Sequence, residues 1–209
     1  MTTTNKEAEA ALTKGIDAAK NYNFNSSIIY YTKAIELDPK LTGAYNSRGK
    51  AYHNLKKDEE AIADYTKAIE LDPKLAAAYN NRGNAYRNLK DYLKAIADYT
   101  KAIELDPKLA AAYYNRGNVY INLKEYPKTI ADYTKAIELD PKLAVAYYNR
   151  GNAYMNLEKY PEAIADYTKA IELDPKLTGA YNYRGNAYKS LGKNNEANAD
   201  FAKVKAPEM

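Results

Sequence analysis

The stretch YTKAIELDPKL, at residues 31–41, returns unchanged at residues 65–75, 99–109, 133–143 and 167–177. Each copy begins 34 residues after the previous one, so the period runs through most of the 209-residue chain. A unit of this length cannot bury an apolar face by itself, whereas stacked units bury a continuous core. The period therefore predicts an array of stacked repeats, and it places any function on the exposed faces of the stack.

Each period holds two amphipathic helical patterns. Apolar and small residues fall on one side of a helix at residues 44–55, and again at residues 61–71. Pro73 ends the second pattern, because proline disfavours a helical conformation in the residue before it. Gly49 lies inside the first helix, where glycine costs about 1 kcal/mol relative to alanine, so we expect a close approach there. The sequence thus predicts an all-α fold of paired helices.

Composition excludes several kinds of chemistry. The net charge is +4, and basic and acidic residues alternate within each repeat, as on a solvated helical surface. The chain has no cysteine, and His53 is its only histidine. Neither a nucleophile–base triad nor a His/Cys metal site can be assembled from this inventory. We therefore expect a protein that is not an enzyme and holds no metal or other cofactor.

No stretch of the chain approaches the roughly 20 apolar residues of a membrane span. The first residues also lack the apolar run of a signal peptide. A cytoplasmic location is the expectation, with a removed leader or a longer parent protein left open.

The repeated columns resemble the tetratricopeptide repeat (TPR) family, whose units have two antiparallel helices. In the unit that begins at Thr42, the matching columns are held by Tyr45, Gly49, Tyr52, Ala61, Tyr65, Ala68 and Pro73. The resemblance implies an all-α, right-handed superhelical solenoid of antiparallel helix pairs, which forms a single domain over residues 1–209. Its six units are expected at residues 8–41, 42–75, 76–109, 110–143, 144–177 and 178–209.

The two terminal units depart from the inner ones. In the first unit, Ala11 and Ala18 stand where inner units have tyrosine, so residues 8–41 are expected to form a degenerate N-terminal cap. In the last unit, Asn194, Asn198 and Lys205 stand where the preceding unit has apolar residues. A polar outer face on a terminal repeat keeps a solenoid soluble. Residues 178–209 are therefore expected to form a polar C-terminal cap.

One arginine and one aspartate recur at matching positions. Arg48 lies at the edge of the buried side of the first helix, and Asp64 at the edge of the second. The planar fork of arginine matches a carboxylate well, so we expect a structural ion pair rather than a ligand site. The same pair recurs as Arg82 and Asp98, Arg116 and Asp132, Arg150 and Asp166, and Arg184 and Asp200.

The resemblance implies that the polar side of each first helix lines a concave groove. Three asparagine columns lie there, and an amide offers the donor and acceptor that the main chain of an extended peptide also offers. The same asparagines are common in the family, so a structural role is the alternative. Of the tyrosines, only Tyr114, Tyr148 and Tyr183 are candidates for a surface role. The expected partner-binding residues are Asn81, Asn84, Asn88, Tyr114, Asn115, Asn118, Asn122, Tyr148, Asn149, Asn152, Asn156, Asn186, Lys50 and Arg87.

These observations predict a protein–protein interaction scaffold that binds an extended peptide or a helix of a partner in the concave groove. The alternative is a homo-oligomerising assembly scaffold, because near-identical repeats present near-identical surfaces. The carboxylate clamp of chaperone-binding relatives is incomplete, since Ala111, Val145 and Asn149 stand where basic residues are needed. Nucleic acid is disfavoured, because phosphate binding needs Lys and Arg along the groove and these columns are mostly neutral.

Overall fold

The computed structural model describes residues 3–205, which form twelve helices and no strand within that range. The helices are α1 (Thr3–Lys20), α2 (Phe24–Leu37), α3 (Thr42–Asn54), α4 (Asp58–Leu71), α5 (Ala76–Asn88), α6 (Tyr92–Leu105), α7 (Ala110–Asn122), α8 (Tyr126–Leu139), α9 (Ala144–Asn156), α10 (Tyr160–Leu173), α11 (Thr178–Ser190) and α12 (Asn194–Lys205). This arrangement confirms the all-α fold of paired helices.

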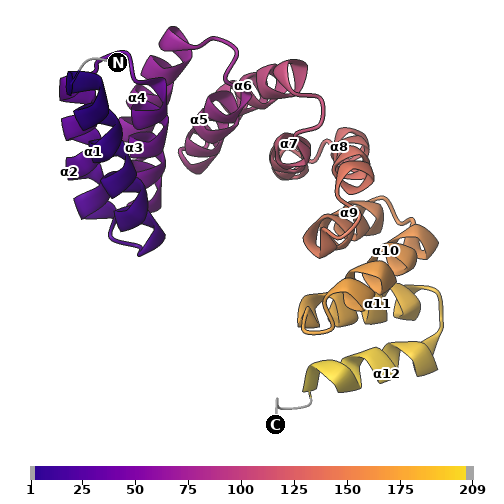
Figure 1. Cartoon of the computed structure of the whole chain (residues 1–209). Helices are drawn as coiled ribbons and strands as arrows, with labels where there is room; N and C mark the ends of the chain where they lie inside the picture. The colour runs from indigo at the N-terminus through magenta and orange to yellow at the C-terminus, as the bar shows by residue number, and fades with distance from the viewer. Residues whose placement is uncertain (1–2, 206–209) are drawn as a thin grey trace. The chain divides into compact units, whose positions relative to one another are not determined.

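The chain divides into two units, Met1–Pro107 and Lys108–Met209. Unit 1 contains α1–α6 and unit 2 contains α7–α12, and successive helices lie side by side in each (Figure 1). In unit 1, α3 also contacts α1 and α5, and in unit 2, α9 contacts α11. Odd-numbered helices therefore share one side of each unit. The single-domain interpretation over residues 1–209 stays a prediction.

Each odd helix ends in a turn with one residue of positive φ. After α3, Lys56 has φ 61°, and the Lys57 N–H donates to the Tyr52 carbonyl oxygen at 3.0 Å. This bond closes the end of a helix whose last carbonyls lack partners within it. Positive φ recurs after the other odd helices at Tyr22, Lys90, Lys124, Glu158 and Gly192.

Each repeated Asp-Pro pair stops an even helix, as the sequence predicted. Asp72 caps α4 in an extended conformation, and its Oδ1 accepts from the Lys74 N–H at 3.0 Å. Pro73 lies between them and cannot continue the helix. The same side-chain turn forms at Asp38, Asp140 and Asp174.

An aromatic ring of the paired even helix fills the space that the glycine in the middle of each odd helix leaves. A Cβ added to Gly49 would lie 2.7 Å from Cε1 of Tyr65, whose side chain is buried. Equivalent contacts form at Gly83, Gly117 and Gly151, while Phe201 takes the place of the tyrosine beside Gly185. The predicted close approach is confirmed, and the neighbour is an aromatic ring of the paired helix.

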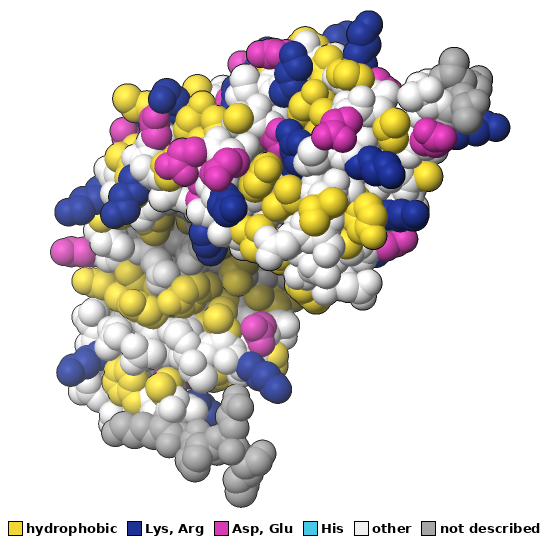
Figure 2. All heavy atoms as spheres, turned by 90° about the vertical axis from the view of Figure 1, so that its left-hand side faces the viewer, with side chains coloured by type: hydrophobic (Ala, Val, Ile, Leu, Met, Phe, Trp, Pro, Cys, Tyr) yellow, Lys and Arg dark blue, Asp and Glu magenta, His cyan; other side chains and the backbone are white. Residues whose placement is uncertain are grey.

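Charged side chains are dispersed over the surface. Figure 2 shows Lys and Arg side chains intermixed with Asp and Glu side chains on the face it presents, with hydrophobic patches between them. At the C-terminal end, Asn194 and Asn198 are exposed, while the side chain of Lys205 lies outside the described residues. At the N-terminal end, Ala11 is buried.

Two glycines of α3 make a matched test of the glycine–tyrosine packing. We expect Gly49→Ala to lower the free energy of unfolding by about 1–3 kcal/mol, because the new methyl group overlaps the Tyr65 ring. Gly43→Ala should leave it unchanged or raise it by up to about 1 kcal/mol, because a Cβ there meets only Leu12 Cδ2 at 4.0 Å. Urea denaturation followed by circular dichroism measures both. Equal stabilities of the two variants would contradict this account.

Candidate partner-binding faces

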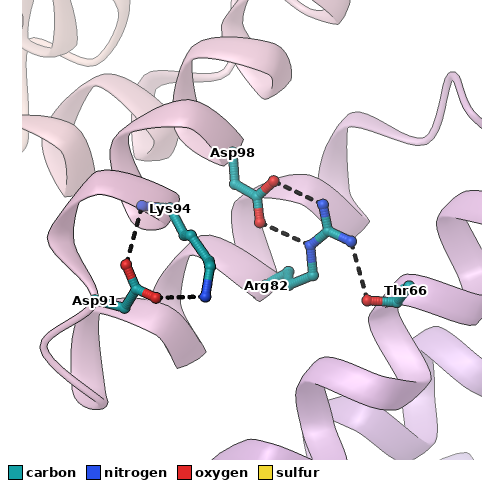
Figure 3. Close-up of polar contacts among 5 residues, drawn as sticks. All are labelled: Thr66, Arg82, Asp91, Lys94 and Asp98. Atoms are coloured by element: carbon teal, nitrogen blue, oxygen red, sulfur yellow. Dashed lines mark hydrogen bonds and ion pairs between the residues drawn. The ribbon is translucent and has the colours of Figure 1, made fainter.

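The arginine that recurs on the odd helices joins three helices. In Figure 3, Nε and Nη2 of Arg82 on α5 each donate to a carboxylate oxygen of Asp98 on α6, both at 2.8 Å. Nη1 of Arg82 donates to Oγ1 of Thr66 on α4 at 3.0 Å. The Asp98 carboxylate, itself buried, raises the pKa of the Arg82 guanidinium. The same three-way arrangement forms around Arg48, Arg150 and Arg184.

The predicted structural role of these arginines is therefore confirmed. The third bond, to a threonine of the preceding even helix, was not predicted. It connects neighbouring repeats, because α4 precedes the α5–α6 pair. These arginines thus hold the helices of neighbouring repeats together.

Removing one charge of this pair should be costly. We expect Asp98→Asn to lower the free energy of unfolding by about 3 kcal/mol, because the largely buried Arg82 loses its countercharge. Glu70→Gln breaks the exposed pair between Glu70 and Lys67, so it should change stability little. Chemical denaturation of both variants gives the comparison, and an equally small effect of Asp98→Asn would contradict the assigned role.

One asparagine column is tied to the core. Oδ1 of Asn84 accepts a hydrogen bond from the Tyr99 hydroxyl at 2.8 Å, and burial raises the pKa of Tyr99, which keeps this donor protonated. Asn118 accepts from Tyr133 at 2.7 Å, and Asn152 accepts from Tyr167 at 2.8 Å. The oxygens of this column therefore have a structural role. Asn186 differs, because Phe201 has no hydroxyl to donate to it.

A second column forms bonds between odd helices. In unit 1, Nδ2 of Asn81 on α5 donates to Oδ1 of Asn46 on α3 at 3.1 Å. In unit 2, Nδ2 of Asn149 on α9 donates to the Tyr114 hydroxyl on α7 at 3.1 Å and to Asn118 Oδ1 at 3.4 Å. Sequence reasoning did not single out Asn46. Asn115 is half-buried on α7 and also has a polar or electrostatic interaction.

Aromatic rings continue this surface in unit 2. The Tyr148 and Tyr183 ring centroids lie 5.9 Å apart in an edge-to-face arrangement, and Tyr183 stacks on the buried Tyr167 at 6.2 Å. Tyr114 packs against the buried Tyr133 at 5.7 Å. We call Tyr114, Tyr148, Asn149 and Tyr183 the polar-aromatic row of unit 2. Tyr183 is 41% exposed, whereas Tyr114 and Tyr148 are half-buried.

The third asparagine column bonds the ends of odd helices to the starts of even ones. Nδ2 of Asn88 donates to Oδ2 of Asp58 at 3.2 Å, and the other oxygen of Asp58 bonds the ring of His53. The hydroxyl of Tyr126 donates to Oδ1 of Asn156 at 3.1 Å. His53 is half-buried beside the buried Asp58.

The remaining predicted partner-binding residues are Asn122, Lys50 and Arg87, and all three lie on odd helices. Asn122 is exposed at the end of α7, Lys50 is exposed on α3, and Arg87 is half-buried near the end of α5. Across residues 3–205, no group of three or more His, Asp or Glu side chains could hold a metal ion. Among the described helices, none is long and apolar enough to cross a membrane.

These features define a helical-repeat protein that presents ordered polar and aromatic side chains on its odd helices. The chain belongs to the tetratricopeptide repeat family. Family models described as tetratricopeptide repeat match residues 23–41, 43–75, 76–109, 110–143, 144–177 and 166–197. Members of this family are typically scaffolds without catalytic activity. The family assignment indicates a role in protein–protein interaction. A search of curated proteins finds no match.

Several solved structures resemble this protein. MamA is 29% identical, with a TM-score of 0.72 over 82% of this chain and 93% of its own. YrrB, described as a TPR protein with an unusual peptide-binding site, is 26% identical, with a TM-score of 0.72 over 83% of this chain and 90% of its own. PilF of Pseudomonas aeruginosa is 17% identical, with a TM-score of 0.86 over 98% and 93%, which supports the fold alone.

Proposed function

We propose that this protein is an interaction scaffold that binds an extended peptide or a helix of a partner protein on its odd helices. The observation that supports this proposal most directly is the polar-aromatic row of unit 2. The peptide-binding site named for YrrB supports the same kind of function. The rest of the predicted set, including Asn81, Lys50 and Arg87, remains a prediction.

The row is suited to an extended main chain. Asn149 carries an amide and Tyr114 a hydroxyl, and both groups can donate and accept hydrogen bonds. They can therefore bind the main chain of a partner whatever its side chains are. The faces of Tyr148 and Tyr183 offer apolar contact, and tyrosines are enriched among residues that dominate binding. A side chain already fixed by packing loses less conformational entropy when a partner binds. The stacking of Tyr183 on Tyr167 is such a constraint.

Two asparagine columns have a supporting part in this proposal. In unit 2, the oxygens of Asn118 and Asn152 accept from the hydroxyls of Tyr133 and Tyr167, against whose rings the tyrosines of the row pack, so these two asparagines support the row. Asn84 makes the same bond with Tyr99 in unit 1. Asn88 and Asn156 hold helix ends in a comparable way. Partner contact is therefore assigned first to the row and to the exposed Asn122.

The chain itself supplies substitutions that test the row. Other repeats carry asparagine at the positions of these tyrosines. Asn46 is the equivalent of Tyr114, and Asn149 is the equivalent of Tyr183. We therefore expect the triple variant Tyr114→Asn, Tyr148→Asn, Tyr183→Asn to stay folded. Peptides selected by the wild-type protein from a random displayed library should bind this variant at least about ten-fold more weakly, because aromatic anchors dominate such interfaces.

The matched control is the double variant Lys135→Ala, Lys169→Ala on the exposed sides of α8 and α10. It should bind the selected peptides with unchanged affinity. Fluorescence anisotropy measures the affinities, and circular dichroism verifies that each variant is folded. Unchanged binding by the triple variant, or a selection that enriches no peptide, would contradict the proposal.

A second candidate function is self-assembly, and an apolar patch on α2 favours it. Ile29 is 68% exposed and lines, with Ile28 and Thr32, a surface cavity of about 440 Å³. Exposed apolar patches commonly mark interaction sites. The equivalent position in the other repeats is alanine, at Ala63, Ala97, Ala131, Ala165 and Ala199.

Analytical ultracentrifugation tests this second function. If the patch joins two copies, the wild-type protein should show concentration-dependent association that Ile29→Ala abolishes, because the substitution removes most of the exposed side chain. Leu93→Ala is the control, since Leu93 is 80% exposed on α6, away from the patch residues in sequence. A wild-type protein that is monomeric at every concentration, or an equal effect of Leu93→Ala, would rule the function out.

A further inference from the structure

A cleft of about 490 Å³ opens in unit 1 between α1, the start of α2 and α3. Its apolar wall includes Ile16, Tyr22 and Phe24, and its polar lining includes Lys20, Lys50 and Asn54. Only Lys50 of these residues was among the predicted partner-binding residues. The cleft is therefore a separate feature from the polar-aromatic row, which lies in unit 2.

At the cleft, the first repeat lacks a polar bond that joins the second and third repeats. Between α4 and α5, Asp58 at the start of the even helix accepts from Asn88 at 3.2 Å. Phe24 occupies the position of Asp58 in the first repeat, and an aromatic ring cannot supply that acceptor. Asn54, the equivalent of Asn88, donates instead to the backbone oxygen of Lys50 at 2.8 Å. An apolar wall thus replaces the polar bridge of the later repeat.

Two further substitutions enlarge this wall. Ile16 is 37% exposed and stands in the column that Asn84, Asn118 and Asn152 occupy in later repeats. Tyr22 is 82% exposed, in the positive-φ turn position where most other repeats carry a charged residue. Its ring contacts Phe24 edge-on, with centroids 6.3 Å apart. A pair of aromatic rings beside an exposed isoleucine provides strong apolar contact for a ligand.

The charged side chains that line the cleft are all basic. Lys20 and Lys50 line the cleft, and no Asp or Glu does. Lys20 also lies 3.4 Å from Asp17 on its own helix, but both side chains are largely exposed, so that ion pair is weak. A ligand that offers a carboxylate near its apolar group would match both parts of the lining.

We propose that this cleft binds an acidic segment of a partner protein in which a bulky apolar side chain is adjacent to Asp or Glu. The apolar side chain contacts Ile16, Tyr22 and Phe24, and the carboxylate pairs with Lys20 or Lys50. The cleft does not depend on the polar-aromatic row, so either proposal can fail without the other.

Isoleucine methyl NMR on the full chain tests this assignment. The probes are the acetylated and amidated tetrapeptide Asp-Phe-Glu-Leu and its counterpart Lys-Phe-Lys-Leu. The Ile16 methyl signal, assigned by its loss in Ile16→Asn, should shift saturably with the acidic peptide. The basic peptide should need about ten-fold higher concentration, because two exposed charge pairs are lost. The methyl signal of the buried Ile137 in unit 2 should not move.

Two variants make the test specific. Phe24→Tyr introduces the tyrosine that stands at the equivalent positions 92, 126 and 160, and it should weaken binding of the acidic peptide while leaving the fold intact. Lys20→Ala with Lys50→Ala should remove the preference for the acidic peptide over the basic one, whereas Lys67→Ala with Lys101→Ala on α4 and α6 should not. An Ile16 signal that stays still, equal affinity for the two peptides, or a comparable shift with AMP would overturn the proposal.

Discussion

The guanidinium of one arginine in each inner repeat sets the geometry on which the exposed faces depend. Its fork fixes the two helices of a pair, as Arg82 does with Asp98, and its third nitrogen reaches the threonine of the preceding even helix. The ring of Tyr79 lies 5.7 Å from the same guanidinium, which adds a cation–π contact. A largely buried charge is costly when any of its hydrogen-bond partners is missing. The arginine network therefore favours the one helix arrangement in which every partner is in place.

The first repeat lacks this arrangement, whereas the last repeat keeps it around Arg184. Lys14 and Tyr30 stand in the first repeat where inner repeats have arginine and aspartate, and Ala202 stands in the last repeat where they have threonine. Arg184 pairs with Asp200 in its own repeat and donates to Thr168 Oγ1 of the preceding even helix at 2.9 Å. The arginine–aspartate pair therefore recurs in every repeat except the first.

The sequence predicted the helix pairs, their proline stops and the arginine–aspartate pairs, because identical repeats place each of these in a fixed register. It did not predict that the Asn84 oxygen is engaged by Tyr99, since a helical projection shows which side a residue occupies but not its partner on another helix. The cleft of unit 1 was missed for a different reason. Phe24 and Ile16 differ from the residues at the equivalent positions of the later repeats, and this difference could have indicated the cleft. The sequence analysis interpreted the irregular residues of the first repeat only as a degenerate cap.

Exposed columns differ between the inner repeats, while the buried tyrosine of the even helix is the same in each. Tyr65, Tyr99, Tyr133 and Tyr167 are all fully buried against glycine, yet the column of Tyr114 and Tyr148 holds asparagine at Asn46 and Asn182. Because the core and the arginine fork fix the backbone, exposed columns can change without repacking the interior. Near-identical repeats therefore need not have identical binding surfaces. The acidic-peptide cleft and the polar-aromatic row are two surfaces of different chemistry on the same helical frame.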